Sequence, residues 1–210
     1  MEKVENITII LGLQADSNTY IFDDVIVDPG TGLNKDYLLN SIKESEINID
    51  DLNRIVNTHC HFDHIGGDKF LQDEYGFEIY MHESDIETVK RGNPNEIAST
   101  SFNMPVPELE LKPLKDGDKI NNFNVIHTPG HTCGGICLYD GESLISGDTI
   151  FSGGSFGRAD LPTGNKEELK ESLNKLTELD VKYLFPGHEA YAINSVNEQI
   201  NMSAQIVSII

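Results

Sequence analysis

The sequence predicts an α/β fold in which two β-sheets pack together and carry helices on their outer faces. Short apolar runs rich in β-branched and aromatic residues cluster in both halves of the chain. Segments with helical apolar spacing lie between and after these runs. The composition, 38% hydrophobic and 24% charged over 210 residues, suits a single globular domain spanning residues 1–210. The order of elements alone also fits other layered α/β folds.

The first half of the chain opens with strands and a sharp turn. Asp28-Pro29-Gly30 has the composition of a tight turn, and the segment after it has apolar residues on one helical face. The predicted elements are, in order, strands at 7–11, 18–22 and 25–28, a helix from about 34, a strand at 54–57, and helices at 66–75 and 83–90.

The second half begins again with strands. Asn121-Asn122 and Asp140-Gly141-Glu142 are hairpin-type turns. Asn165 can cap the clearest helix, and Ser195 with Glu198 has the spacing of a capping box for a final helix. The predicted elements are strands at 119–120, 123–127, 136–139 and 143–146, a helix at 165–178, a strand at 181–185 and a helix after 195.

Charge and composition exclude several classes of partner. The chain has 35 acidic and 15 basic residues, a formal net charge of −20, so it should repel nucleic-acid phosphates and anionic membranes. No apolar stretch approaches the roughly 18 residues that span a bilayer. The start, MEKVENITII, lacks a signal-peptide pattern, and three cysteines make no disulfide framework. We therefore expect a cytoplasmic protein.

The segment THCHFDHIGG at 58–67 carries the strongest functional signal. It follows a predicted strand, and His59 and His61 project to the same side of an extended segment, so both can reach one ion. Past the strand end the chain must bend, which lets Asp63 and His64 address a second point nearby. Imidazole and carboxylate together suit zinc, iron or manganese.

Three further candidates follow later strands, each on a turn that contains glycine. His131 lies in TPGHT, Asp148 in SGDT and His188 in FPGH. Because functional side chains are usually carried on loops at strand ends, we expect these three to join the histidine-rich segment. Metal binding is the prediction.

Other polar residues receive structural or pocket roles. His82 and His127 are expected to be structural, and Cys60, between two proposed ligands, should turn its thiol into the core. The glycine-rich stretch GGSFGRAD places Arg158 on a loop that we expect to line a substrate pocket. Phe156 and Tyr191 are further candidate pocket residues.

These residues together resemble the metallo-β-lactamase superfamily. HCHFDH matches its H-x-H-x-D-H signature, and VDPG at 27–30 matches its strand and turn before the first helix. The resemblance spans nearly the whole chain and implies a four-layer αβ/βα sandwich with the site at one edge between the sheets. It also implies the ligand sets: His59, His61 and His131 for one metal, Asp63, His64 and His188 for the second, and Asp148 as a bridge.

Within the superfamily, GDTIFSGGSFGRADLPTGN resembles the hydroxyacylglutathione hydrolase (glyoxalase II-like) group. This implies a hydrolase with two zinc ions, or iron or manganese, that cleaves a small-molecule thioester by a metal-bridging hydroxide. Asp63 and Asp148 would be catalytic, and Asp28 would support a ligand histidine. Common zinc β-lactamases carry cysteine at the place of Asp148, which argues against β-lactam hydrolysis. The thiol carrier stays open, because about one helix follows His188 in place of a glutathione-gripping domain.

Alternative functions remain at this point. A persulfide dioxygenase of the same fold would bind a single iron through His59, His131 and Asp148. A lactonase-type hydrolase and a metal-stabilised binding module are others. The oligomeric state is open too, since Val196, Ile200, Ile206 and Val207 of the final helix could pack internally or form a dimer interface.

Overall fold

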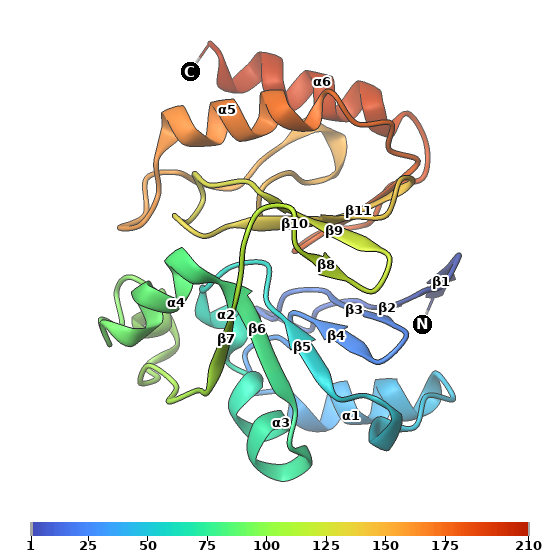
Figure 1. Cartoon of the computed structure of the whole chain (residues 1–210), viewed down its shortest axis with the longest axis vertical. Coiled ribbons are helices and arrows are strands. Elements are labelled where there is room, and N and C mark those ends of the chain that lie inside the picture. The colour runs from blue at the N-terminus through green and yellow to red at the C-terminus, as the bar shows by residue number, and fades with distance from the viewer. Residues whose placement is uncertain (1, 210) are drawn as a thin grey trace.

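The computed structural model describes residues 2–209, and within that range the strands form two sheets (Figure 1). The first sheet runs in chain order from β1 to β7. Its strands are β1 (Glu2–Val4), β2 (Ile7–Ile10), β3 (Thr19–Phe22), β4 (Val25–Val27), β5 (Arg54–Val56), β6 (Glu78–His82) and β7 (Leu111–Leu114). β1 to β4 pair antiparallel, and β4 to β7 pair parallel.

The second sheet has the order β12-β11-β10-β9-β8 among the described residues. Its strands are β8 (Lys119–Ile120), β9 (Phe123–His127), β10 (Ile136–Tyr139), β11 (Ser143–Gly147) and β12 (Tyr183–Pro186). β8 to β11 form antiparallel hairpins, and β11 pairs parallel with β12. The turns predicted at 121–122 and 140–142 connect these hairpins, which confirms both predictions.

Helices cover the outer faces of both sheets, which confirms the predicted sandwich. In Figure 1, α5 and α6 lie above the second sheet, and α1 and α3 lie below the first. The α-helices are α1 (Lys35–Glu44), α2 (Phe62–Ile65), α3 (Asp68–Tyr75), α4 (Glu83–Lys90), α5 (Lys166–Leu176) and α6 (Val196–Val207). Short 3-10 turns lie at Ile49–Asp51, Ser99–Phe102 and Ser152–Gly154.

Alternation along the strands explains the layers. On β3, Tyr20 and Phe22 join the core between the sheets, whereas Ile21 packs in the cluster under α1. The ring of Phe22 lies 4.4 Å from that of Phe123 in the opposite sheet. Each such large apolar side chain contributes roughly 1.5–3 kcal/mol when fully buried. A third cluster packs α5 and α6 onto the second sheet and contains Leu173 and Ile200.

The helix ends test the capping predictions. The side chain of Asn165 accepts hydrogen bonds from the backbone N–H groups of Glu167 and Glu168, as predicted. The capping box at Ser195 and Glu198 was wrong. Ser195 has a left-handed backbone (φ 50°) and makes no side-chain cap, although its carbonyl accepts the first hydrogen bond of α6 from the N–H of Gln199.

The apolar face of α6 is turned inward. Val196, Ile200 and Val207 are buried against α5 and the second sheet, whereas Ile206 is 36% exposed. Contacts within the chain therefore bury three of the four apolar residues that could have formed a dimer interface. These contacts do not decide the oligomeric state.

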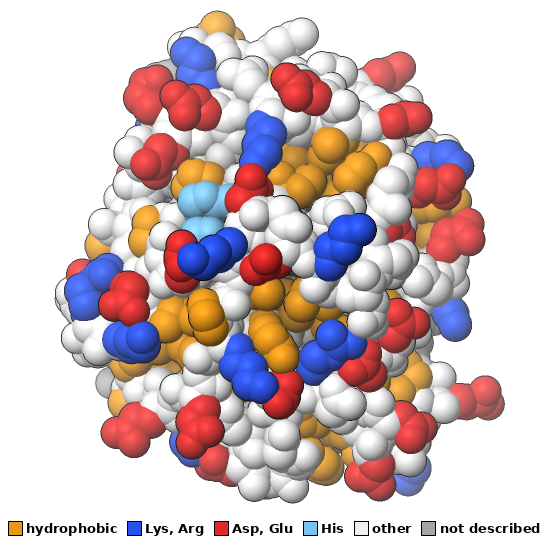
Figure 2. Space-filling view, viewed as in Figure 1, with side chains coloured by type: hydrophobic (Ala, Val, Ile, Leu, Met, Phe, Trp, Pro, Cys, Tyr) orange, Lys and Arg blue, Asp and Glu red, His pale blue; other side chains and the backbone are white. Residues whose placement is uncertain are grey.

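On the face seen in Figure 2, basic side chains lie beside acidic ones. The ion pairs of the chain include Lys115 with Glu83 at 3.2 Å and Lys90 with Glu87 at 2.9 Å. Across residues 2–209, no helix has the length and apolar character needed to cross a bilayer.

Candidate metal centre

The predicted metal-binding residues meet at one edge of the sandwich, where strands of both sheets end. The segment after β5 supplies His59 and His61 and then begins α2, which carries Asp63 and His64. The loops after β9, β11 and β12 supply His131, Asp148 and His188. We call these seven residues the cluster: His59, His61, Asp63, His64, His131, Asp148 and His188. The structure brings all of them together.

The inner group consists of His59, His61 and His131. Their donor atoms all lie within 4.8 Å of one another, and all three side chains are buried. His61 Nδ1 faces His131 Nε2 at 2.9 Å. Burial and the neighbouring His131 lower the pKa of His61 to about 3, and burial with nearby histidines lowers the pKa of His59 well below its usual range. Neutral rings keep a lone pair available for a metal ion.

The outer group consists of Asp63, His64 and His188, whose donor atoms again lie within 4.8 Å of one another. His188 Nε2 lies 3.1 Å from Asp63 Oδ2, and His64 Nε2 lies 3.9 Å from the same oxygen. Asp63 and His188 are only partly buried, unlike the inner group. Although burial raises it, the hydrogen bond from His188 and the charge of His64 leave the pKa of Asp63 lowered.

Asp148 lies between the two groups. Its carboxylate oxygens are 3.5 Å from His131 Nε2, 3.4 Å from His64 Nε2 and 3.7 Å from His188 Nε2. Burial alone would raise its pKa, but the surrounding histidines lower it, so the group is ionised. A Cβ at Gly187 would lie 2.2 Å from Asp148 Oδ1, so only glycine fits beside the carboxylate.

Hydrogen bonds from outside the cluster set the orientation of its rings. His64 Nδ1 donates to Asp28 Oδ2 at 2.9 Å, as predicted for Asp28, and His131 Nδ1 donates to the carbonyl of Arg158 at 2.7 Å. The hydroxyl of Thr58 lies 3.2 Å from His59 Nδ1 and donates to Asp28. These bonds engage Nδ1 of His59, His64 and His131 and leave Nε2 of these three rings for the cluster, as in proteins where a carboxylate or carbonyl orients a metal-binding histidine.

The donor set fits a metal ion. Within residues 2–209, the buried atoms His59 Nε2, His61 Nε2, His64 Nε2 and Asp148 Oδ1 have no hydrogen-bond partner. Buried polar atoms without partners are costly, and a cation among them removes that cost. The charges of Asp148 and Asp28 outweigh burial and raise the pKa of His64 well above its usual value. The field that favours a proton on this ring also favours a metal ion.

The predicted pocket side chains are engaged in other contacts. Arg158 is exposed and pairs with Asp160 at 2.8 Å, so it reaches the cluster through its backbone carbonyl. Phe156 packs against the core under α5 and α6. The ring of Tyr191 lies 6.1 Å from that of Phe185, and its hydroxyl donates to Glu2. Their role in a substrate pocket stays a prediction.

Sequence reasoning missed the polar residues that hold the last loop in place. The hydroxyl of Tyr20 donates to the carbonyl of Pro186 at 2.6 Å. The amide of Asn18 donates to the same carbonyl at 3.1 Å and to that of Glu189 at 2.8 Å. Both lie on the β3 side of the first sheet and so fix His188 to the opposite half of the chain. In the sequence, the only indication of this role was a polar group within the predicted strand at 18–22.

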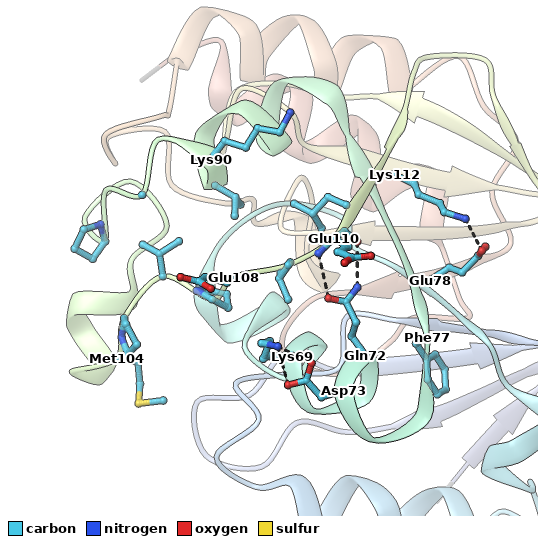
Figure 3. Close-up of a pocket in the computed structure, with 18 of the residues that line it drawn as sticks. Lys69, Gln72, Asp73, Phe77, Glu78, Lys90, Met104, Glu108, Glu110 and Lys112 are labelled. Atoms are coloured by element: carbon cyan, nitrogen blue, oxygen red, sulfur yellow. Dashed lines mark hydrogen bonds and ion pairs between the residues drawn. The ribbon is translucent and has the colours of Figure 1, made fainter.

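A large surface groove lies elsewhere (Figure 3). Residues of α3, β7 and the preceding segment line it, among them Gln72, Glu110 and Lys112. Gln72 donates to the carbonyl of Glu110 at 3.1 Å and accepts from its N–H, which ties that segment to α3. No member of the cluster lines this groove. The size of a groove therefore does not by itself identify the candidate metal site.

Comparison with known proteins agrees with the geometry. The sequence model of the metallo-β-lactamase superfamily matches residues 15–188, a range that contains the whole cluster. The chain belongs to this superfamily. A probable metallo-hydrolase of Methanocaldococcus jannaschii is 33% identical, over 82% of this chain and 87% of the relative. The hydroxyacylglutathione hydrolase GloC of Haemophilus influenzae is 35% identical, over 81% of this chain and 84% of the relative.

A solved structure is similar to this protein over almost the whole chain. The protein TTHA1623, crystallised in a di-iron-bound form, superimposes with a TM-score of 0.77 at 26% identity and covers 94% of this chain and 97% of its own. This superfamily member therefore has the histidine and aspartate donors for a dinuclear metal centre.

Proposed function

We propose that this superfamily member is a metal-dependent hydrolase that cleaves small-molecule thioesters of 2-hydroxy acids, as in the hydroxyacylglutathione hydrolase group. The observation that carries the proposal is the position of Asp148, within 3.4 Å of a histidine of the outer group and 3.5 Å of one of the inner group. The 35% identity with the Haemophilus influenzae hydroxyacylglutathione hydrolase supports the choice of thioester.

The residues present would hold two divalent ions, one in each group. When bound, such ions would lower the pKa of a water molecule and polarise the carbonyl oxygen of the substrate. Histidine and carboxylate donors without thiolate suit zinc, iron and manganese. Zinc is the metal that we propose, and metal analysis distinguishes it from iron.

The chain's own residues would orient and activate the attacking water. Although burial raises it, His188 and His64 hold the pKa of Asp63 below its ordinary value, and its side chain is 22% exposed, so the carboxylate can accept a hydrogen bond from a water at the mouth of the site. Asp28 keeps the proton of His64 on Nδ1 and thereby leaves Nε2 for the metal.

The leaving group needs little help from the protein. A free thiol has a pKa of about 8.5, so a thiolate leaves readily near neutral pH. Cleavage of such a substrate therefore needs no dedicated general acid beside the cluster. An amide would require protonation of its leaving nitrogen.

The test is thiol release from S-lactoylglutathione by protein of known metal content. We expect about two metals per chain, loss of activity with a chelator, and recovery when zinc is added back. Thiol release that survives complete metal removal would contradict the proposal. One iron per chain, with oxygen uptake on glutathione persulfide, would identify a persulfide dioxygenase instead. Hydrolysis of lactones without thioester cleavage would identify a lactonase.

A further inference from the structure

Asp85 lies outside the cluster, in the first turn of α4, and its side chain is fully buried. A buried carboxylate is costly unless several donors satisfy it. Two loops supply those donors: the segment that carries His59 and His61, and the loop that carries His131. Asp85 therefore contacts both segments that provide the inner group.

The contacts of the Asp85 carboxylate are divided between its two oxygens. Oδ2 accepts from the backbone N–H of Cys60 and from the hydroxyl of Thr132, both at 2.8 Å. Oδ1 accepts from the N–H of Gly134 at 2.7 Å and faces the thiol of Cys133 at 3.5 Å. Cys60 stands between two inner-group histidines, and Thr132 follows the third.

Gly134 brings its loop unusually close to α4. A Cβ added there would lie 2.5 Å from the Asp85 backbone nitrogen and 2.6 Å from its Cγ. The backbone of Gly134 lies outside the left-handed region, so the glycine is required by this contact and not by its conformation. The close approach and the hydrogen bonds together clamp two loops that are distant in sequence.

We propose that Asp85 is a positioning residue that locks the His59–His61 segment to the His131 loop and thereby preassembles the inner group for its metal ion. The inference rests on the metal-binding part of the proposed function and is independent of the thioester. The metal affinity of the outer group should not depend on Asp85, because Asp28, Asn18 and Tyr20 hold the loops of that group.

The test is a titration of metal-free protein with cobalt(II), followed by the visible absorption of the bound ion. Asp85→Asn keeps the size of the side chain but turns an N–H₂ group toward donors. Gly134→Ala keeps the carboxylate and wedges a methyl group against it. For each variant we expect the affinity of one of two cobalt sites to fall about 10–100-fold, with the other within about twofold of the wild type.

Two control variants separate positioning from general loss of stability. Asp68→Asn replaces another buried aspartate in the first turn of a helix, one that accepts from Asn57 and whose pKa burial raises well above its usual range. Asparagine mimics the neutral acid there, so both cobalt sites should stay unchanged. Ile42→Ala removes core volume under α1, in a cluster that contains no residue of either loop, and should lower the unfolding temperature without selective loss of one site.

The outcomes are distinguishable. Selective weakening of one site in both Asp85→Asn and Gly134→Ala supports the proposal, and Gly134→Ala alone decides if Asp85→Asn does not fold. Equal weakening of both sites, or two wild-type affinities in a folded variant, would overturn it. Wild-type protein that binds no cobalt would contradict the proposed function instead.

Discussion

His82 and His127 stack face to face, with ring centroids 3.9 Å apart and planes 10° apart, whereas most neighbouring rings of the cluster meet edge to face. In the stacked pair, one nitrogen of each ring has a local partner. His82 Nδ1 accepts from the N–H of Ser84, and His127 Nε2 faces the carbonyl of Cys133 at 3.1 Å. In the cluster, one nitrogen of His64 is committed to Asp28 and the other has no partner among residues 2–209.

The difference shows what separates a structural histidine from a metal-binding one. Stacking and local hydrogen bonds satisfy the pair within the protein. The cluster leaves several buried lone pairs close together, and a cation can satisfy them together. Substitutions in the cluster and in the stacked pair should therefore have different effects.

Asp148→Asn should have the largest effect, because it removes the one charge placed between the inner and outer groups. We expect kcat/KM for the thioester to fall by about 10²–10³-fold or more, comparable to loss of a charge-stabilising group in an active site. Metal content should fall as well. Steady-state kinetics and metal analysis measure both.

The matched control is Asp160→Asn, which removes an exposed carboxylate that pairs with Arg158. Exposed pairs contribute about 0–1 kcal/mol, so activity should be close to the wild type. Full turnover in Asp148→Asn would show that catalysis does not depend on the carboxylate between the inner and outer groups, which would contradict its proposed role.

Asp28→Asn should have an intermediate effect. The amide donates where the carboxylate accepts, so the proton of His64 moves from Nδ1 to Nε2, the atom that faces Asp148. We expect the outer site to lose about 10–100-fold in metal affinity. The cobalt titration measures it, and selective loss at the inner site would show that the contact with Thr58 matters more.

His82→Asn should have the smallest effect, visible in the pH dependence of stability. Burial and the neighbouring His127 lower the pKa of His82 to about 4, against about 6.5 in an unfolded chain. As the pH falls from about 6.5 to 4, the unfolded chain binds the proton first, so this histidine destabilises the fold progressively. Asparagine removes the titration and can still accept from the N–H of Ser84.

Urea unfolding of metal-free protein at pH 7 and pH 5 checks this expectation. The variant should lose less stability than the wild type between these values. The lowered pKa values of His59 and His61 act in the same direction but are common to both proteins, so they cancel in the comparison. An equal loss in both proteins would show that His82 titrates normally in the fold.

The sequence predicted the layers, the hairpins and the residues of the cluster because each carries a local signal. A short run of β-branched and aromatic residues marks β3, and turn residues mark the hairpins. It did not predict β1, β6 or β7. β7 contains Pro113, which breaks a strand pattern but is tolerated because β7 is at the edge of its sheet.

The supporting residues were harder to predict, because long-range packing defines them. Asp85 looks like an ordinary acidic residue in a first helical turn until the fold buries it against two loops. Ser195 matched a capping pattern, yet its backbone conformation prevented the bond. Local spacing thus identified what could bind a metal, and only the packed structure showed what holds those residues in place.

The assembly of the cluster from strand ends in both sheets has a consequence for biosynthesis. The inner group is incomplete until residue 131 has been made, and the outer group until residue 188. A growing chain with His59, His61 and His64 exposed has only part of each donor set, and weak partial sites exchange their ions freely. Stable metal binding should therefore follow the docking of the two sheets. Each bound ion would then link residues from the two halves of the chain and stabilise the folded state.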